Sequence, residues 1–207
     1  MKRRGAAGFD AAAAVRRARA QLRESCRVKQ RISAKLLAEL AEFARLTLEA
    51  FSRGRRVYFF GNGGSAADAQ HLAAELQGRL RLNRAALPAL ALTTNTSTLT
   101  AIGNDTRFTD IFARQVEGLV ERGDIVVGIT TSGSSANVLA GLRAARRRGA
   151  RTVAFTGART EKIKALADVL LAVPSRDTQR IQEAHICLLH ALCEVVDATL
   201  FPEPASA

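Results

Sequence analysis

The fold is decided by residues 57–65, which read VYFFGNGGS. The first five residues are a short apolar run rich in strand formers, and the glycine-rich turn leads directly into a helical stretch at 65–78. Four more apolar runs follow at 89–92, 125–129, 152–156 and 169–173, and they alternate with helical stretches at 96–104, 109–121, 135–148, 161–167 and 178–200. Strands that alternate with helices predict a parallel sheet in a doubly wound α/β fold, and continuous apolar runs suit strands buried on both faces.

A different pattern precedes this alternation. Residues 10–53 contain no proline and carry apolar side chains at helical spacing, among them Ile32, Leu36 and Phe43. This spacing predicts two amphipathic helices with a break near residues 25–29. Residues 1–9 are expected to form a frayed basic tail. We therefore expect a tail and helical arm over residues 1–53, joined to an α/β domain over residues 54–207 in one structural unit.

The composition indicates which classes of partner the protein is expected to bind. The formal charge is +12, but the basic residues alternate with acidic ones along the chain, and there is no Trp and one Tyr to stack on bases. We interpret the excess charge as solvation of helix faces and attraction of an anionic substrate, and we expect no nucleic-acid partner. No apolar run approaches the roughly 18 residues of a membrane span. The three cysteines form no CxxC pair, which favours a reducing compartment, and we expect a cytoplasmic protein with no membrane partner.

Two loops are candidates for binding phosphate, because ligands of such folds lie beyond the carboxyl ends of the strands. One is the glycine-rich loop at 61–65, and the other is the segment 130–135, which has five hydroxyl side chains in six residues. Each loop precedes a helix, whose N-terminal N–H groups favour an anion. A tight turn and a hydroxyl-rich helix cap are the alternative interpretations of the two loops.

A nucleotide is not expected in these loops. Residues 61–66 match a relaxed dinucleotide-binding pattern, but the next strand is followed by Thr93, Thr94 and Asn95, with no acidic residue for a ribose. A phosphate-binding loop of the NTPase kind is excluded because no Lys follows the glycines. We expect no nucleotide cofactor, and a phosphorylated sugar fits better.

Polar side chains on two helices complete the candidate site. His71 and Glu75 are four residues apart after the glycine loop, a spacing that suits two ligands of one metal, a base with its orienting partner, or a surface ion pair. The last helix carries Gln182, His185 and His190 among apolar residues. A histidine in such surroundings is typical of a hydrogen-bonded core residue.

Four motifs resemble, in order and spacing, those of the phosphoheptose isomerase family of sugar-isomerase (SIS) domains. They are GNGGSAADAQHLAAEL at 61–76, AIGND at 101–105, TTSGSSANV at 130–138 and RIQEAHICLLH at 180–190. The likeness covers most of residues 30–200. It implies a five-stranded parallel sheet flanked by helices, a homotetramer with shared active sites, and isomerisation of sedoheptulose 7-phosphate to D-glycero-D-manno-heptose 7-phosphate for heptose biosynthesis.

The resemblance also assigns residues. It implies one zinc ion held by His71, Glu75, Gln182 and His190. It implies that the sugar phosphate is bound by Asn62, Gly63, Gly64, Ser65, Glu75, Asn104, Asp105, Thr130, Thr131, Ser132, Ser135 and Gln182. Isomerisation through an enediol needs a base at carbon and an acid at oxygen. We assign Glu75 as the base and His190 as the acid, and an exchange of these roles stays open.

The chain departs from the family pattern in places. The family often has Ser-Thr-Ser where Thr130, Thr131 and Ser132 stand, and residues 93–100 differ more. The stretch CEVVDATLFP at 193–202 resembles a non-enzymatic relative, the DnaA-initiator-associating protein. That relative lacks the acidic residue and the last histidine of the isomerase set, whereas this chain keeps Glu75 and His190. We therefore expect an enzyme in preference to a regulator of that type, with no DnaA-type partner, or a sugar-phosphate sensor.

Overall fold

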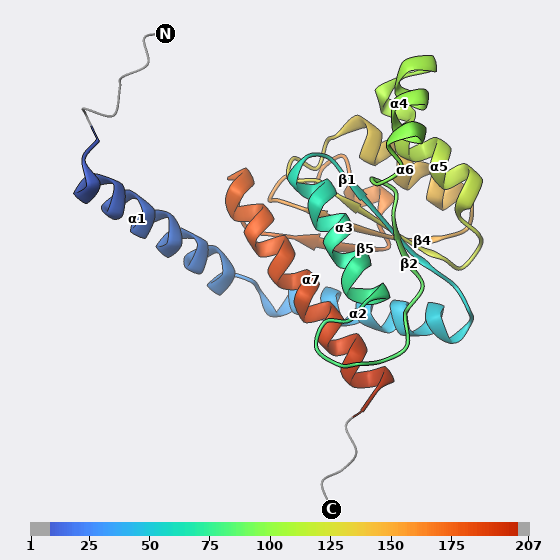
Figure 1. The fold of residues 1–207 in the computed structure, drawn as a ribbon, viewed down its shortest axis with the longest axis horizontal. Coiled ribbons are helices and arrows are strands. Elements are labelled where there is room, and N and C mark those ends of the chain that lie inside the picture. The colour runs from blue at the N-terminus through green and yellow to red at the C-terminus, as the bar shows by residue number, and fades with distance from the viewer. Residues whose placement is uncertain (1–8, 203–207) are drawn as a thin grey trace, which may run out of the picture.

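The computed structural model of the protein describes residues 9–202 and centres on a five-stranded sheet (Figure 1). All strand pairs are parallel, and the strands lie in the order β2-β1-β3-β4-β5. The strands are β1 (Val57–Gly61), β2 (Ala89–Ala91), β3 (Ile125–Ile129), β4 (Arg151–Thr156) and β5 (Val169–Ala172). The predicted doubly wound α/β fold with five parallel strands is confirmed.

Helices follow every strand except β4, largely as the alternating pattern predicts. They are α3 (Gly64–Gln77), α4 (Thr96–Asp105), α5 (Ile111–Leu119), α6 (Ala136–Arg147) and α7 (Thr178–Leu200). The stretch predicted as a helix at 109–121 begins with a 3-10 turn, η2 (Phe108–Asp110), and α5 itself ends at Leu119. The helix predicted near 161–167 is wrong, because the short connection from β4 to β5 has room only for the 3-10 turn η3 (Lys164–Leu166).

The N-terminal arm consists of two helices, α1 (Ala11–Gln30) and α2 (Ala34–Ser52). The break predicted near residues 25–29 is wrong. The Ser25 hydroxyl accepts a hydrogen bond from Lys29 at 2.7 Å and the helix continues past both residues. The chain turns instead just before Ser33, whose hydroxyl accepts from the Leu36 amide at 3.2 Å and so caps α2. The predicted basic tail lies, up to residue 8, outside the described residues.

Alternate residues of strand β1 face two different layers of helices. Val57 and Phe59 belong to a core shared with α2, α3 and α7, whereas Tyr58 and Phe60 belong to a core shared with α5 and α6. This alternation follows from the two-residue period of a strand. Figure 1 shows α1 and α4 projecting from the body, with α1 leaving at one side of α7. Within residues 9–202, every helix is too short or too polar to cross a bilayer.

The strand order places the candidate loops side by side. From β1 the chain moves to β2 on one side and then to β3 on the other, so the connections after β1 and β3 run to opposite faces of the sheet. A crevice opens where strand order reverses in this way, at the carboxyl ends of the two strands. The loops at 61–65 and 130–135 begin at those two ends.

Candidate functional site

The loops after β1 and β3 enclose a cavity of about 280 Å³ together with the first turns of α7. Most of the predicted substrate-binding residues therefore lie together. The residues that line the cavity are Asn62, Gly63, Gly64, Ser65, Ile129, Thr130, Thr131, Ser135, Thr178 and Gln182.

The glycines allow the backbone to form one wall of this cavity. Gly63 has φ of +54°, a conformation that side-chain-bearing residues rarely adopt. At Gly64, an added Cβ atom would collide with the amide group of Gln182, so Gln182 can take this position only beside a glycine. The predicted ligand Gln182 lies directly against the glycine loop, and phosphate binding by this loop stays a prediction.

Two helices begin at the cavity without a side-chain cap. Helices α1, α2, α4 and α7 each begin with an Asp, Ser or Asn side chain that accepts from a first-turn amide. No side chain caps α3 at Gly63 or α6 at Ser135. Uncapped N–H groups at a helix N-terminus carry partial positive charge and bind phosphate well. Both loops therefore offer what an anionic group requires.

The hydroxyl groups of the second loop form a cluster. Thr130 Oγ1 lies 2.9 Å from Ser135 Oγ and 3.3 Å from Ser132 Oγ, and Ser134 N–H donates to Ser132 Oγ at 3.2 Å. Ser132 does not line the cavity itself, but it contacts two residues that do. A phosphate that entered would replace these weak mutual contacts by charge-assisted hydrogen bonds.

An amide pair joins the two loops and was not predicted. Asn62 Nδ2 donates to Asn137 Oδ1 and Asn137 Nδ2 donates to Asn62 Oδ1, both at 2.8 Å. Asn137 is 3% exposed and also accepts from the Val138 amide. It lies inside the TTSGSSANV motif, but no spacing rule pairs an asparagine with one 75 positions away. Its role in holding the glycine loop beside the hydroxyl loop is visible only in three dimensions.

Three of the four predicted metal ligands on α3 and α7 converge, whereas the amide of the fourth, Gln182, lies against Gly64. His71 Nε2 lies 3.0 Å from Glu75 Oε1 and 3.2 Å from His190 Nε2. One ligand atom from each of these three residues lies within 4.8 Å of the others. Two imidazole nitrogens and one carboxylate oxygen form a donor set that zinc accepts, with a fourth position left for another ligand. The residues therefore fit a zinc ion, and we call them the His71–Glu75–His190 cluster.

A second carboxylate near this cluster, Asp68, is not among the predicted site residues. Burial raises the pKa of Asp68 to about 6, and the neighbouring His71 lowers it in part. Asp68 Oδ2 is buried without a hydrogen-bond partner among the described residues. A carboxylate beside an imidazole orients the ring in many metal sites. Asp68 lies near His71, and the signal that could have found it is its spacing of three residues before His71.

His185 is a core residue, as its apolar surroundings predict. Its side chain is fully buried, its Nε2 lies 3.2 Å from the Thr156 carbonyl oxygen, and it packs edge-on against Phe155. Burial lowers the pKa of His185 to about 4, and the bond to Thr156 offsets part of that effect. The ring is therefore neutral near pH 7 and does not face the cavity.

Asn104 and Asp105 stand apart from the other predicted site residues. Both are exposed at the end of α4, where Asn104 Nδ2 donates to Asp105 Oδ1 at 2.9 Å. Neither lines the cavity between the two loops. Figure 1 shows α4 projecting from the body of the molecule.

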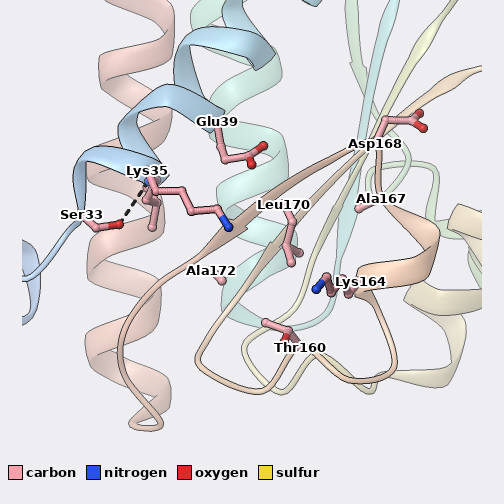
Figure 2. A pocket seen from close by; sticks show the side chains of 10 residues that line it. Ser33, Lys35, Glu39, Thr160, Lys164, Ala167, Asp168, Leu170 and Ala172 are labelled. Atoms are coloured by element: carbon pink, nitrogen blue, oxygen red, sulfur yellow. Dashed lines mark hydrogen bonds between the residues drawn. The ribbon is translucent and has the colours of Figure 1, made fainter.

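A larger cavity, of about 430 Å³, lies beside the edge strand β5 (Figure 2). Lys35 and Lys164 point into it, but Glu39 also lines it and balances part of their charge. Asp168 at its rim accepts hydrogen bonds from the Thr152 amide and hydroxyl. This cavity shares no lining residue with the one between the loops. Its size does not make it the site, because no candidate catalytic group lines it.

Comparison with known proteins agrees with this arrangement. The family model for the SIS domain matches residues 22–157. The chain is 51% identical over 183 residues to the phosphoheptose isomerase of Geobacter sulfurreducens, covering 88% of this chain and 97% of the relative.

Two solved structures show the same fold. The phosphoheptose isomerase of Neisseria gonorrhoeae aligns with a TM-score of 0.83 at 46% identity, covering 88% of this chain and 98% of that one. The phosphoheptose isomerase of Francisella tularensis aligns with a TM-score of 0.85 at 33% identity, covering 89% and 98%. With the phosphate-type loops and the His71–Glu75–His190 cluster in place, these similarities show that the chain belongs to the phosphoheptose isomerase family of SIS-domain proteins.

Proposed function

We propose that the protein isomerises sedoheptulose 7-phosphate to D-glycero-D-manno-heptose 7-phosphate. One observation carries the proposal: α3 begins in the phosphate-type cavity and carries His71 and Glu75 toward its other end, where they meet His190. His71 lies seven residues beyond Gly64, about 10 Å along the helix axis. A substrate that reaches both ends has its phosphate and its carbonyl far apart, as a 2-ketose 7-phosphate does. The Geobacter, Neisseria and Francisella relatives carry the matching name.

The chemistry needs two proton transfers. A proton leaves C1 and one is delivered to C2, while another moves from the oxygen on C1 to the oxygen on C2, so an enediol lies between ketose and aldose. Glu75 Oε1 contacts His71, and no described residue hydrogen-bonds Oε2. We assign Glu75 Oε2 as the base at carbon and His190 as the acid at oxygen, and a zinc ion on His190 Nε2 would compete with the second role.

A zinc ion fits beside these groups. His71, Glu75 and His190 would hold it, with Gln182 as the further ligand that the family resemblance implies. When bound, the metal would polarise the substrate carbonyl. Since Gln182 lies against Gly64 in the cavity wall, it is also placed to contact the sugar phosphate.

Turnover by the purified protein tests the proposed function. Sedoheptulose 7-phosphate should be converted to the aldose, and in deuterium oxide the product should carry deuterium at C2. Glu75→Gln should lower kcat by roughly 10²–10⁴-fold with a smaller change in KM. Glu117→Gln, at an exposed carboxylate of α5, is the matched control and should behave as wild type. Near-wild-type turnover in Glu75→Gln would exclude this mechanism. No turnover by the wild type would favour the alternative hypothesis of a non-enzymatic regulator.

A homotetramer is the assembly we propose. Helix α1 projects from the body (Figure 1) and exposes apolar side chains, with Val15 58% and Leu22 69% exposed. Such a face on a projecting helix is best buried against equivalent helices of other copies. Because Asn104 and Asp105 do not line this chain's own cavity, a neighbouring copy is where they would meet substrate. Light scattering should give four times the 22.2 kDa of one chain, and a monomeric mass at micromolar concentration would contradict this assembly.

The setting we propose is the cytoplasm, where heptose phosphates would be made for cell-surface carbohydrate. The absence of disulfides among Cys26, Cys187 and Cys193 supports a reducing compartment. No nucleic-acid partner is proposed, because the basic residues are spread along the chain and alternate with acidic ones. Some exposed arginines pair with carboxylates, as Arg45 does with Glu42 and Arg147 with Glu117.

A further inference from the structure

A buried arginine joins the two helices that carry the His71–Glu75–His190 cluster. The side chain of Arg84, in the segment between α3 and β2, is 2% exposed, and that of Asp197 on α7 is 5% exposed. Arg84 Nε donates to Asp197 Oδ1 at 2.8 Å. A buried arginine needs several acceptors to offset the loss of its hydration.

The terminal nitrogens of Arg84 donate to the last turn of α3, and Nη1 also donates to the Gly78 and Ala85 carbonyl oxygens at 3.3 and 3.1 Å. Nη2 donates to the Glu75 carbonyl oxygen at 2.9 Å, and Nη1 donates to the Leu76 carbonyl oxygen at 2.7 Å. Carbonyls in the last turn of a helix have no partner within the helix, so the guanidinium replaces a C-terminal cap. Its planar donors serve α3 and α7 at once, which the single ammonium group of a lysine cannot reproduce.

These bonds lie next to the cluster on both helices. On α3 the acceptor is Glu75 itself, through its backbone. On α7, Asp197 follows His190 by seven residues, which places both on the same face two turns apart. Apart from the contacts of His71 with His190 and of Gly64 with Gln182, the two helices meet through apolar residues such as Leu72, Leu76 and Cys193. Apolar contacts tolerate small shifts along and around a helix axis, whereas directional hydrogen bonds select one register.

We propose that Arg84 is a positioning residue that sets the register of α3 against α7 and thereby brings Glu75 and His71 within ligand distance of His190. The proposal rests on the proposed function for its readouts of turnover and zinc binding. Arg84 touches neither the substrate nor the reacting atoms, and it acts through the backbone of Glu75.

The test compares two variants with a matched control. Arg84→Met removes all of the bonds, and Arg84→Lys keeps a positive charge opposite Asp197 but gives up the paired carbonyl contacts. Arg81→Met is the control. Arg81 lies in the same segment as Arg84 and pairs at 3.2 Å with Glu194, which like Asp197 is on α7, but its side chain is 78% exposed. Zinc affinity is measured by competition with a chromophoric chelator, alongside kcat, KM and urea unfolding of each variant.

Loss of a residue that orients a metal ligand typically costs 10–100-fold in affinity or activity. We expect Arg84→Lys to be folded, with zinc affinity and kcat each at least about 10-fold lower, and with KM little changed because the phosphate loops lie at the other end of α3. Arg81→Met should match the wild type. A purely structural role would lower the unfolding free energy of Arg84→Lys yet leave zinc affinity and kcat of the folded protein unchanged, and that result would overturn the proposal.

Failure of the proposed function gives a different result. If the wild type binds zinc but does not convert the heptulose phosphate, the proposed function fails and zinc affinity alone decides the role of Arg84. If the wild type is active but binds no zinc, kcat of the Arg84 variants decides whether Arg84 is a positioning residue. Should Arg84→Met not fold, Arg84→Lys and Asp197→Asn provide the same comparison, and unchanged values in both would overturn the positioning role. A wild type that neither binds zinc nor turns over substrate would overturn it together with the proposed function.

Discussion

Lowering the pH from 7 to 5 should destabilise this protein through one buried side chain, His185. The ring is fully buried on α7, with Nε2 donating to the Thr156 carbonyl at 3.2 Å and Nδ1 without a partner among the described residues. A protonated ring would bring an uncompensated charge and a second donor into this site. Burial therefore lowers the pKa of His185 from 6.5 to about 4.

The sign and size follow from proton linkage. Between pH 6.5 and pH 4 the unfolded chain carries a proton on His185 and the folded chain does not, so the free energy of unfolding falls as the pH falls. The limiting slope is about 1.4 kcal/mol per pH unit, which amounts to about 2 kcal/mol between pH 7 and 5 for this group. Asp68 acts in the opposite direction, since its raised pKa lets the folded chain hold a proton that the unfolded chain releases.

The assay separates His185 from every other titrating group. Urea unfolding of the wild type and of His185→Gln is followed at pH 7, 6 and 5, with chelator present and at one protein concentration. Glutamine keeps a donor for Thr156 but does not titrate, so the variant should lose about 2 kcal/mol less than the wild type over this range. Parallel pH dependences for the two proteins would refute the claim that a buried neutral His185 supports the fold.

Three further changes probe the site. Replacing Ser132 and Ser135 together by Ala should raise KM with the fold intact, because each lost hydrogen bond to phosphate weakens the binding free energy by about 1.5–3 kcal/mol. An unchanged KM would remove this loop from the site. Asn137→Leu should separate the two loops by leaving Asn62 without its amide partner, so KM should rise while zinc affinity holds, and equal losses in both would point to general unfolding instead. Removing metal with a chelator should abolish turnover and added zinc should restore it, whereas activity indifferent to chelator, with no metal found by elemental analysis, would exclude a metal role.

Local patterns were sufficient for the elements and the loops. Strands β1 and β3 and helix α7 have the bounds predicted from apolar runs and helical spacing, because continuous burial and the 3.6-residue period leave a direct record in the sequence. The glycine loop and the hydroxyl loop were found from their composition at the ends of two predicted strands. The prediction failed at the break between α1 and α2, which the cap at Ser33 places a few residues later.

The arrangement of the site depended on contacts between distant residues. Nothing local pairs Asn62 with Asn137, aligns Arg84 with Asp197, or leaves Asn104 and Asp105 outside the cavity. A helix pattern records which face is apolar, but it does not record how far one helix is shifted along its neighbour. The separation of His71 from His190 is set by that shift, so the residue types of a metal site could be predicted from the sequence, while their convergence became apparent only when α3 and α7 were packed together.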